Sequence, residues 1–258
     1  MKNTDKGYLH YRHEVTVAVS DTDFNGQIKP SALMGYFQDI AAAHAGLLGL
    51  GYDDMMKNNL VWVMIRMSFK VLVSPEIGEP LTIVTFPEKP NAADVNRGYY
   101  IYNKAGETVV LGSTKWCALD VDKHKPHRCR QIFERFADAD FIPTQPFDDA
   151  NIKLGAISEC GAPIEEPIVY TVQVTDLDKN IHMNNARYGD IIINVCGVEM
   201  LQKNSLVRVD VNFMSQLLNG DVYEVFKAQN GDTTFIEAKK AGSDTVVFRA
   251  RAEWRKRF

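Results

Sequence analysis

The stretch VAVSDTDFN at residues 17–25 returns as VQVTDLDKN at residues 172–180, and this repeat organises the chain. Both valines, both aspartates and the final asparagine are identical at a constant offset of 155 residues. Strand-like alternation precedes each copy, and a mostly apolar run that fits a helix follows each, at residues 31–51 and 186–202. Each copy therefore marks a junction between a strand and a helix.

The similarity continues beyond the helices. Residues 61–86 and 207–228 each predict two strands joined by a turn, at Gly78-Glu79 in the first copy and at Gly220-Asp221 in the second. A further hairpin follows in each copy, and its last strand carries one tryptophan, Trp116 or Trp254. Three matches in the same order indicate a duplicated unit of roughly 100–120 residues.

Each unit predicts an α+β architecture. A long apolar helix should be largely buried, and the antiparallel strands that follow it suggest a sheet wrapped around that helix. Two such units in tandem resemble the double hotdog fold. We predict an N-terminal unit at residues 1–124, a linker rich in proline, glycine and acidic residues at 125–167, and a C-terminal unit at 168–258.

The charge balance argues against some partner classes. The 258 residues carry a formal net charge of −4 and a calculated pI of about 5.9, so nothing global indicates nucleic acid or an anionic membrane. Two basic clusters stand out, KHKPHRCR at residues 123–130 and RARAEWRKRF at 249–258. Each is either solvated surface or a docking site for an acidic partner.

We expect an enzyme of the cytoplasm without a metal or cofactor. The first residues lack the apolar core of a signal peptide, and no apolar run approaches the 18 residues of a membrane span. The four cysteines are far apart in sequence, which favours reduced thiols. His124 and His127 have no acidic or cysteine companion nearby, and Pro126 prevents a helix between them.

The second repeat carries the chemistry-bearing motif, DLDKNIHMNN at residues 176–185. With Tyr188 it resembles the Asp-x-Asn-x-His-x-Asn-Asn-x-x-Tyr signature of acyl-ACP thioesterases, and the two-unit layout extends the resemblance over essentially the whole chain. The resemblance implies hydrolysis of fatty acyl thioesters of acyl carrier protein in fatty acid biosynthesis. It also implies catalytic roles for Asp178, Asn180 and His182.

The residue types suit that reaction. A thioester needs little acid assistance, because its thiolate leaving group has a pKa of about 8.5. The enzyme must activate a water and stabilise an oxyanion. An imidazole at His182 is the natural proton acceptor, Asp178 would orient it or polarise the water, and Asn180 would hold the water or the carbonyl. The helix start near Asn184 or Asn185 offers N–H groups to an oxyanion.

One position departs from the family pattern. Members of the family often carry a glutamate on a later strand, and plant members carry a cysteine just after it. When the turn at Gly220-Asp221 is placed in register, Gln216 and Leu217 occupy these two positions. A cysteine nucleophile at that place is excluded, and Gln216 can hydrogen-bond but cannot act as a base. General-base work therefore falls to His182 or Asp178, or the enzyme is slow.

The first repeat serves as an internal control. It keeps Asp21, Asp23 and Asn25, but Gln27 stands where His182 stands in the second copy. Aspartate and asparagine recur in turns and helix caps for structural reasons alone. The imidazole is therefore the feature that distinguishes the copies.

The resemblance assigns the acyl chain to the N-terminal unit. Large apolar residues there are candidates to line a tunnel, although ordinary core packing is the favoured explanation for each of them: Met34, Phe37, Trp62 and Met64. Arg66 interrupts an apolar run and suggests a carboxylate or phosphate partner, and His44 reads as a satisfied core histidine.

Three other functions stay open. The first alternative is hydrolysis of acyl-CoA, since both carriers end in the same phosphopantetheine arm. The second is hydration of enoyl thioesters, and the third is binding of acyl thioesters without cleavage. The preferred chain length depends on tunnel depth, which the sequence does not give. A tandem hotdog also allows either a monomer or a homodimer.

Overall fold

The computed structural model describes residues 9–141 and 145–257, which group into two compact units. Unit 1 comprises residues 1–17 and 36–151, and unit 2 comprises residues 18–35 and 152–258. The loop of the first repeat therefore groups with unit 2. The predicted segments 1–124, 125–167 and 168–258 stay a prediction.

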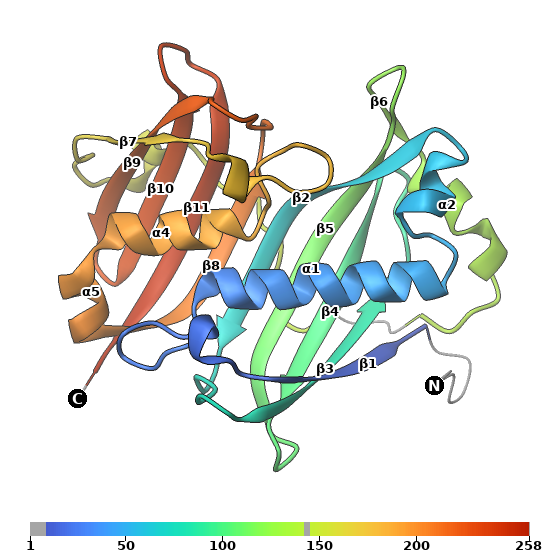
Figure 1. The fold of residues 1–258 in the computed structure, drawn as a ribbon, viewed down its shortest axis with the longest axis horizontal. Coiled ribbons are helices and arrows are strands. Elements are labelled where there is room, and N and C mark those ends of the chain that lie inside the picture. Colours follow the sequence, from blue (N-terminus) through green and yellow to red (C-terminus); the bar gives the residue numbers. More distant parts are fainter. Residues whose placement is uncertain (1–8, 142–144, 258) are drawn as a thin grey trace. The chain divides into compact units, whose positions relative to one another are not determined.

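Unit 1 is an antiparallel sheet with one long helix across it (Figure 1). The strand order is β1-β3-β4-β5-β2, and the short β6 pairs with β5. Its elements are β1 (Tyr11–Thr16), α1 (Pro30–Leu47), α2 (Tyr52–Met56), β2 (Leu60–Val71), β3 (Pro80–Pro87), β4 (Asp94–Tyr102), β5 (Thr108–Asp120), β6 (Lys125–His127) and α3 (Cys129–Ile132), with a 3₁₀ turn η3 (Glu134–Phe136). The first residues of α1 belong to unit 2.

Unit 2 repeats this plan with a shorter helix. The strand order is β8-β11-β10-β9-β7, and every pairing is antiparallel. Its elements are β7 (Ile168–Thr171), α4 (Arg187–Cys196), α5 (Val198–Lys203), β8 (Asn204–Phe213), β9 (Val222–Asn230), β10 (Thr233–Lys240) and β11 (Val246–Lys256), with the 3₁₀ turns η2 (Val19–Asp21), η4 (Ile157–Cys160) and η5 (Val174–Asp176). The predicted α+β tandem hotdog fold is confirmed.

The same backbone bonds close both copies of the repeat. In unit 1 the N–H of Val17 donates to Glu79 O (3.0 Å), and the N–H of Gly78 donates to Val17 O (2.9 Å). In unit 2 Val172 exchanges the equivalent pair with the turn at Gly220 and Asp221, each bond 3.0 Å long. Both turn glycines adopt a positive φ of about 80°, which suits glycine. The duplication seen in the sequence is therefore a duplication of structure.

The helices are buried on one face, not around their circumference as their composition predicts. On α1 the buried positions follow the helical period, and Asp39, Ala42 and Ala43 on the opposite face are exposed. Small alanines made the exposed face look apolar. The predicted second helix at 186–202 is also two helices, since Gly197 with a φ of 79° ends α4 before α5 begins.

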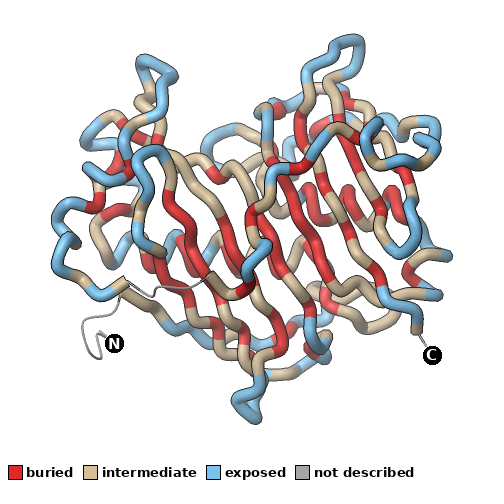
Figure 2. The backbone as a smooth tube through the Cα atoms, turned by 180° about the vertical axis from the view of Figure 1, so that it is seen from behind, coloured by how far each residue is buried: buried red, intermediate tan, exposed pale blue. Residues whose placement is uncertain are grey.

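Buried residues run along the strands and exposed residues gather in the loops (Figure 2). In each unit one sheet face packs against the long helix, and we call this the inner face. Asn151 packs on the outer face of unit 1 through three hydrogen bonds. Asn151 donates from its backbone N–H to Ser68 Oγ (2.8 Å) and from Nδ2 to Ser113 Oγ (2.7 Å), and its carbonyl accepts from Arg66 Nη1 (2.9 Å). The expected anionic partner of Arg66 is thus replaced here by a backbone carbonyl.

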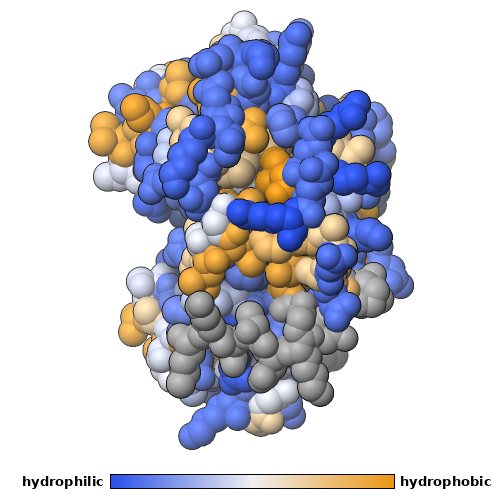
Figure 3. Space-filling view, turned by 90° about the vertical axis from the view of Figure 1, so that its right-hand side faces the viewer, coloured by the Kyte–Doolittle hydropathy of each residue, from blue (hydrophilic) through white to orange (hydrophobic). Residues whose placement is uncertain are grey.

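Apolar side chains also reach the surface where α1 ends and α2 follows (Figure 3). Leu47 is 69% exposed, and Tyr52 and Met56 beside it are exposed as well. Across the described residues, no helix combines the length and apolar character needed to cross a membrane.

Candidate active site

The motif residues form a tight loop between η5 and α4. Asp178 Oδ1 accepts hydrogen bonds from the backbone N–H groups of Asn180 (2.7 Å) and His182 (3.4 Å). The N–H of Asp178 donates to His182 O (2.8 Å), and a bridge between Leu177 and Met183 closes the base of the loop. The aspartate therefore shapes the backbone that carries the histidine.

The first repeat forms the same loop. Asp23 Oδ1 accepts from the N–H groups of Asn25 (2.8 Å) and Gln27 (2.9 Å), and the N–H of Asp23 donates to Gln27 O (2.8 Å). These bonds match those of the second repeat at the offset of 155. Because the loops are alike, the change from Gln27 to His182 alters chemistry rather than backbone shape.

The two asparagines behave differently in the two loops. Asn25 Nδ2 donates to the carbonyl of Leu201 (3.2 Å), which ties its side chain into unit 2. Asn180 is exposed, and among the described residues its Nδ2 makes one long contact of 3.5 Å, with Asp178 Oδ2. The amide of Asn180 is therefore available to a ligand, as a role in holding a carbonyl or a water requires.

A backbone bond holds the segment between β8 and β9, which carries Gln216, beside the motif loop. The N–H of Met183, the residue after His182, donates to Leu217 O (2.9 Å). Met183 and Leu217 are buried, whereas Gln216 is exposed and His182 half-buried. The structure thus places all four proposed catalytic residues in one region of unit 2.

Asn184 and Tyr188 of the motif lie on either side of the start of α4. Asn184 Oδ1 accepts from the N–H of Ala186 (2.9 Å), which forms an Asx turn directly before α4 begins. Tyr188 of the motif is buried and packs edge-on against Phe213 and Phe248. Burial raises the pKa of the Tyr188 phenol above its usual value. These residues position the loop, and the phenol plays a packing role.

Sequence reasoning missed the glycine after this tyrosine. A Cβ on Gly189 would lie 2.5 Å from the backbone nitrogen of Ser31, in the first turn of α1. The start of α4 therefore packs directly against the start of α1, an approach that only glycine permits. A lone glycine inside an apolar helical run carries no signal of this contact.

Backbone strain distinguishes the two loops. Ile181, next to the histidine, has a φ of 63°, and Gly26 occupies the matching position of the first repeat with a φ of 72°. A branched residue in this conformation is strained, and the Ile181 side chain is 66% exposed, so little burial offsets the strain. The chain keeps an exposed apolar side chain beside the proposed catalytic histidine at a cost in stability.

Replacing Ile181 with glycine is expected to stabilise the protein by about 1 kcal/mol, because the left-handed conformation costs an ordinary residue roughly that much. Urea denaturation measures the free energy of unfolding. Gly26→Ala is the matched control and should lose a similar amount, since no atom lies within 4 Å of its new Cβ and only the backbone resists. A destabilised Ile181→Gly would mean that side-chain contacts outweigh the strain.

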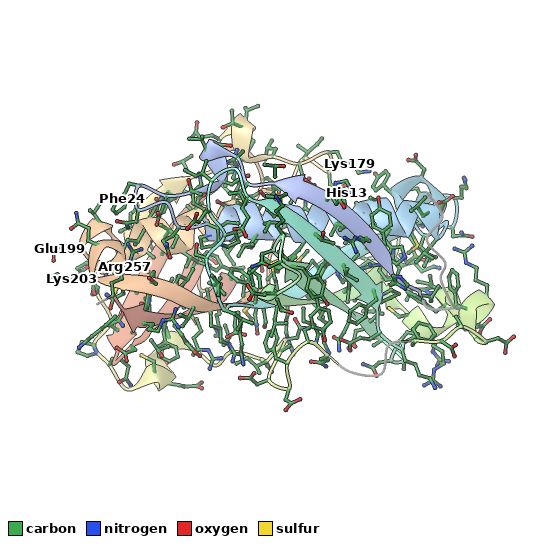
Figure 4. All side chains as sticks on the ribbon, turned by 90° about the horizontal axis from the view of Figure 1, so that it is seen from below. His13, Phe24, Lys179, Glu199, Lys203 and Arg257 are labelled. Carbon is green, nitrogen blue, oxygen red and sulfur yellow. The ribbon has the colours of Figure 1, made fainter. Side chains whose placement is uncertain are left out.

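The first-repeat loop faces a hollow too small for a substrate. The hollow measures about 20 Å³ and is lined in part by Asp23, Gln27, Trp254 and Arg257. A single water molecule needs roughly 10–15 Å³ of such space. Beside it Lys203 pairs with Glu199 (3.6 Å) and accepts at its carbonyl from the N–H of Arg257 (3.0 Å), and the three side chains lie together in Figure 4. This hollow therefore has room for about one water molecule.

The proposed acyl-chain residues lie in the apolar interior. Met34, Phe37 and Met64 are buried, and half-buried Trp62 donates from Nε1 to Leu50 O (3.0 Å). The ring of Phe37 packs closely against the inner face, where a Cβ on Gly112 would lie 2.5 Å from it. Core packing is therefore visible for Phe37, and a role in substrate binding stays a prediction for all four. In the part of the chain that is described, no three metal-binding side chains gather.

Comparison with known proteins identifies two matching domains. Residues 8–134 match the model of the acyl-ACP thioesterase N-terminal domain, and residues 164–256 match that of the C-terminal domain. A chloroplastic acyl-[acyl-carrier-protein] hydrolase of Cuphea viscosissima is 24% identical over 237 residues, which cover 86% of this chain and 57% of the relative. The chain thus spans about three fifths of that relative's length.

Solved structures share the whole fold. A 12:0-ACP thioesterase from Umbellularia californica superposes with a TM-score of 0.83 at 20% identity, over 96% of this chain and 98% of the other. An acyl-ACP thioesterase from Bacteroides thetaiotaomicron gives a TM-score of 0.81 at 19% identity, with the same coverage. Two domain models in the expected order, together with this fold, establish that the chain belongs to the acyl-ACP thioesterase family.

Proposed function

We propose that the protein hydrolyses fatty acyl-ACP thioesters to free fatty acid and holo-ACP, in fatty acid biosynthesis. One observation carries the proposal: two loops of matching shape differ in that only the second bears an imidazole, at His182. A duplicated turn needs no histidine for its backbone. The imidazole is therefore best explained by proton transfer.

The proposed reaction uses a water activated within unit 2. His182 accepts a proton from a water molecule while the oxygen of that water bonds to the thioester carbon. The C–S bond then breaks and releases the thiolate of the carrier. The exposed amide of Asn180 donates to the carbonyl oxygen as negative charge develops there. The carboxylate of Asp178 stabilises the imidazolium, and Gln216 hydrogen-bonds from the neighbouring loop between β8 and β9.

The proposed carrier is acidic, and the basic clusters are its docking candidates. In the C-terminal cluster Arg249 pairs with Glu237 (2.6 Å) and Arg251 with Asp210 (2.8 Å), so these two charges are neutralised internally. Arg255 remains exposed there, with Lys256 beside it. In the other cluster Lys125, Arg128 and Arg130 are exposed. Such charges mainly accelerate encounter, and their effect weakens with salt.

The proposed compartment is the cytoplasm. Cys117, Cys129, Cys160 and Cys196 are all free thiols, as in a reducing environment. Burial raises the pKa of Cys117 to about 11 and of Cys196 to about 12, so neither thiol is activated as a nucleophile. This agrees with attack by water rather than by cysteine.

The deciding experiment measures thiol release from acyl-ACP and acyl-CoA thioesters of six to eighteen carbons. We expect hydrolysis by the wild type, faster with acyl-ACP at low salt, and its loss in His182→Ala. Faster turnover of acyl-CoA would favour the coenzyme as carrier. Thioesters bound but left intact would indicate a binding protein, and hydration of an enoyl thioester would indicate a lyase.

A further inference from the structure

A polar cluster interrupts the apolar interior of unit 1. Arg97 lies on the inner face of β4 and is only 7% exposed. Its Nη1 donates to Nδ1 of His44 on α1 (2.9 Å) and to Oγ1 of Thr85 on β3 (3.3 Å). His44 is 3% exposed, and the ring of Tyr11 stacks over it with 5.6 Å between centroids. A guanidinium, which carries a permanent charge, therefore sits inside the unit.

In the described part of the chain, no carboxylate neutralises this charge. Among the residues that the structure describes, Arg97 forms no ion pair, and its Nε and Nη2 have no hydrogen-bond partner. Arg208 in unit 2 is also buried, but its charge is paired with a carboxylate. It donates two hydrogen bonds to Asp210, at 2.8 and 3.0 Å. A buried charge without such a partner is costly. Within residues 9–141 and 145–257 no carboxylate pairs with Arg97, so its guanidinium can pair with the anion of a ligand.

The cluster offers donors rather than acceptors. Because Nδ1 of His44 accepts from Arg97, the ring proton of His44 is assigned to Nε2. Burial lowers the pKa of His44 to about 3, with Arg97 and His10 contributing, so the ring stays neutral. The hydroxyl of Thr85 donates its single proton to Gly98 O (3.0 Å), so it has no proton left to donate to a ligand. The remaining polar groups are Nε and Nη2 of Arg97 and Nε2 of His44, and each of them can donate to an oxygen ligand.

The cluster lies near one of the residues proposed to line the acyl-chain tunnel. Two residues along β4 from Arg97, the ring of Tyr99 contacts Phe37 with 4.5 Å between centroids, and Phe37 is a proposed acyl-chain residue. His44 is two helical turns from Phe37 on α1, a distance of about 10 Å along the axis. A plain hydrocarbon at this position would leave the guanidinium unpaired.

We propose that Arg97 and His44 bind a carboxylate at the distal end of the acyl chain, so that the preferred substrates are thioesters of dicarboxylic acids. The inference rests on the proposed function for its substrate, but the site itself is argued from unit 1 alone. Nη2 of Arg97 and Nε2 of His44 donate to the distal carboxylate, and the guanidinium neutralises it. A distal hydroxyl would accept the same bonds without the charge, and so bind more weakly.

Binding is tested without catalysis by thermal unfolding. Wild type, Arg97→Met and His182→Ala are each heated with unbranched diacids of eight to eighteen carbons, with the matched monoacids, and with acetate. At one or more lengths the diacid should raise the Tm of wild type and of His182→Ala above the shift from the monoacid, and Arg97→Met should abolish the difference. Equal shifts from diacid and monoacid in the wild type at every length would overturn the proposal, and so would an equal shift from acetate.

Hydrolysis supplies a second readout. Wild type should favour the monothioester of the diacid over the matched acyl thioester by at least about ten-fold in kcat/KM, and Arg97→Met should reverse the preference. A wild type that hydrolyses only plain acyl thioesters overturns this inference and leaves the proposed function standing. Diacid binding that depends on Arg97 in a protein without hydrolase activity supports the site and overturns the proposed function.

The ligand-free variants test whether Arg97 is merely structural. Arg97→Met should keep or raise the Tm, because it removes an uncompensated buried charge and keeps the side-chain volume. Arg208→Met is the matched control and should lower the Tm, since it strips the buried carboxylate of Asp210 of a partner. A comparable fall in both variants would show that Arg97 is satisfied within the folded protein, and would contradict the proposal.

Discussion

Replacing His182 with alanine is expected to reduce thioester hydrolysis by at least about 100-fold, on the scale of lost acid–base catalysis, with the fold intact. The half-buried side chain of His182 is a modest part of the core, and the loop bonds that include its backbone N–H and carbonyl do not need the imidazole. Steady-state thiol release measures the rate, and thermal unfolding should show nearly the same Tm for both proteins.

The chain supplies its own control in Gln27. Gln27→Ala removes the side chain at the matching position of a loop with the same backbone bonds, so it should change the rate by less than about three-fold on the scale of a surface substitution. The pair separates chemistry from loop integrity, because both variants disturb equivalent backbones. If both variants kept full activity, the proposed site would be wrong.

The fold could be predicted largely because the same pattern of strands, turns and helix occurs twice in the sequence. The offset of 155 placed the loops, and the turns at Gly78 and Gly220 placed the strands on either side. Helix ends were less accessible to sequence reasoning. Gly197 divides the second helix through a left-handed backbone, which periodicity alone does not reveal.

Other features need the folded chain because they join residues far apart in sequence. Arg97 and His44 are 53 positions apart, and nothing local in either segment indicates their contact. The same holds for Gly189, whose significance depends on Ser31 lying against it. The roles of Asp178 and Asn180 were left open between turn-shaping and chemistry. The structure shows the turn-shaping bonds of Asp178 directly, and it leaves its second carboxylate oxygen with one long contact.

Two substitutions of Asp178 are expected to separate those roles. Asp178→Ala removes the acceptor of two backbone N–H groups, and should lower the free energy of unfolding by about 1–2 kcal/mol as the loss of a capping side chain does. It should also slow hydrolysis at least about 100-fold, because a loop that shifts by 1 Å misplaces the imidazole. Asp178→Asn keeps an oxygen in place of Oδ1, so the loop and its stability should survive.

The activity of Asp178→Asn then tests the charge alone. We expect a loss of about 100-fold or more, because an amide cannot stabilise the imidazolium that forms when His182 takes a proton. Asp23→Ala is the matched control: it breaks the equivalent bonds in the first loop and should lose the same stability with hydrolysis unchanged. Full activity in Asp178→Asn would contradict the charged role. Asp178 would then only shape the loop, as Asp23 does, and His182 would act without a carboxylate partner.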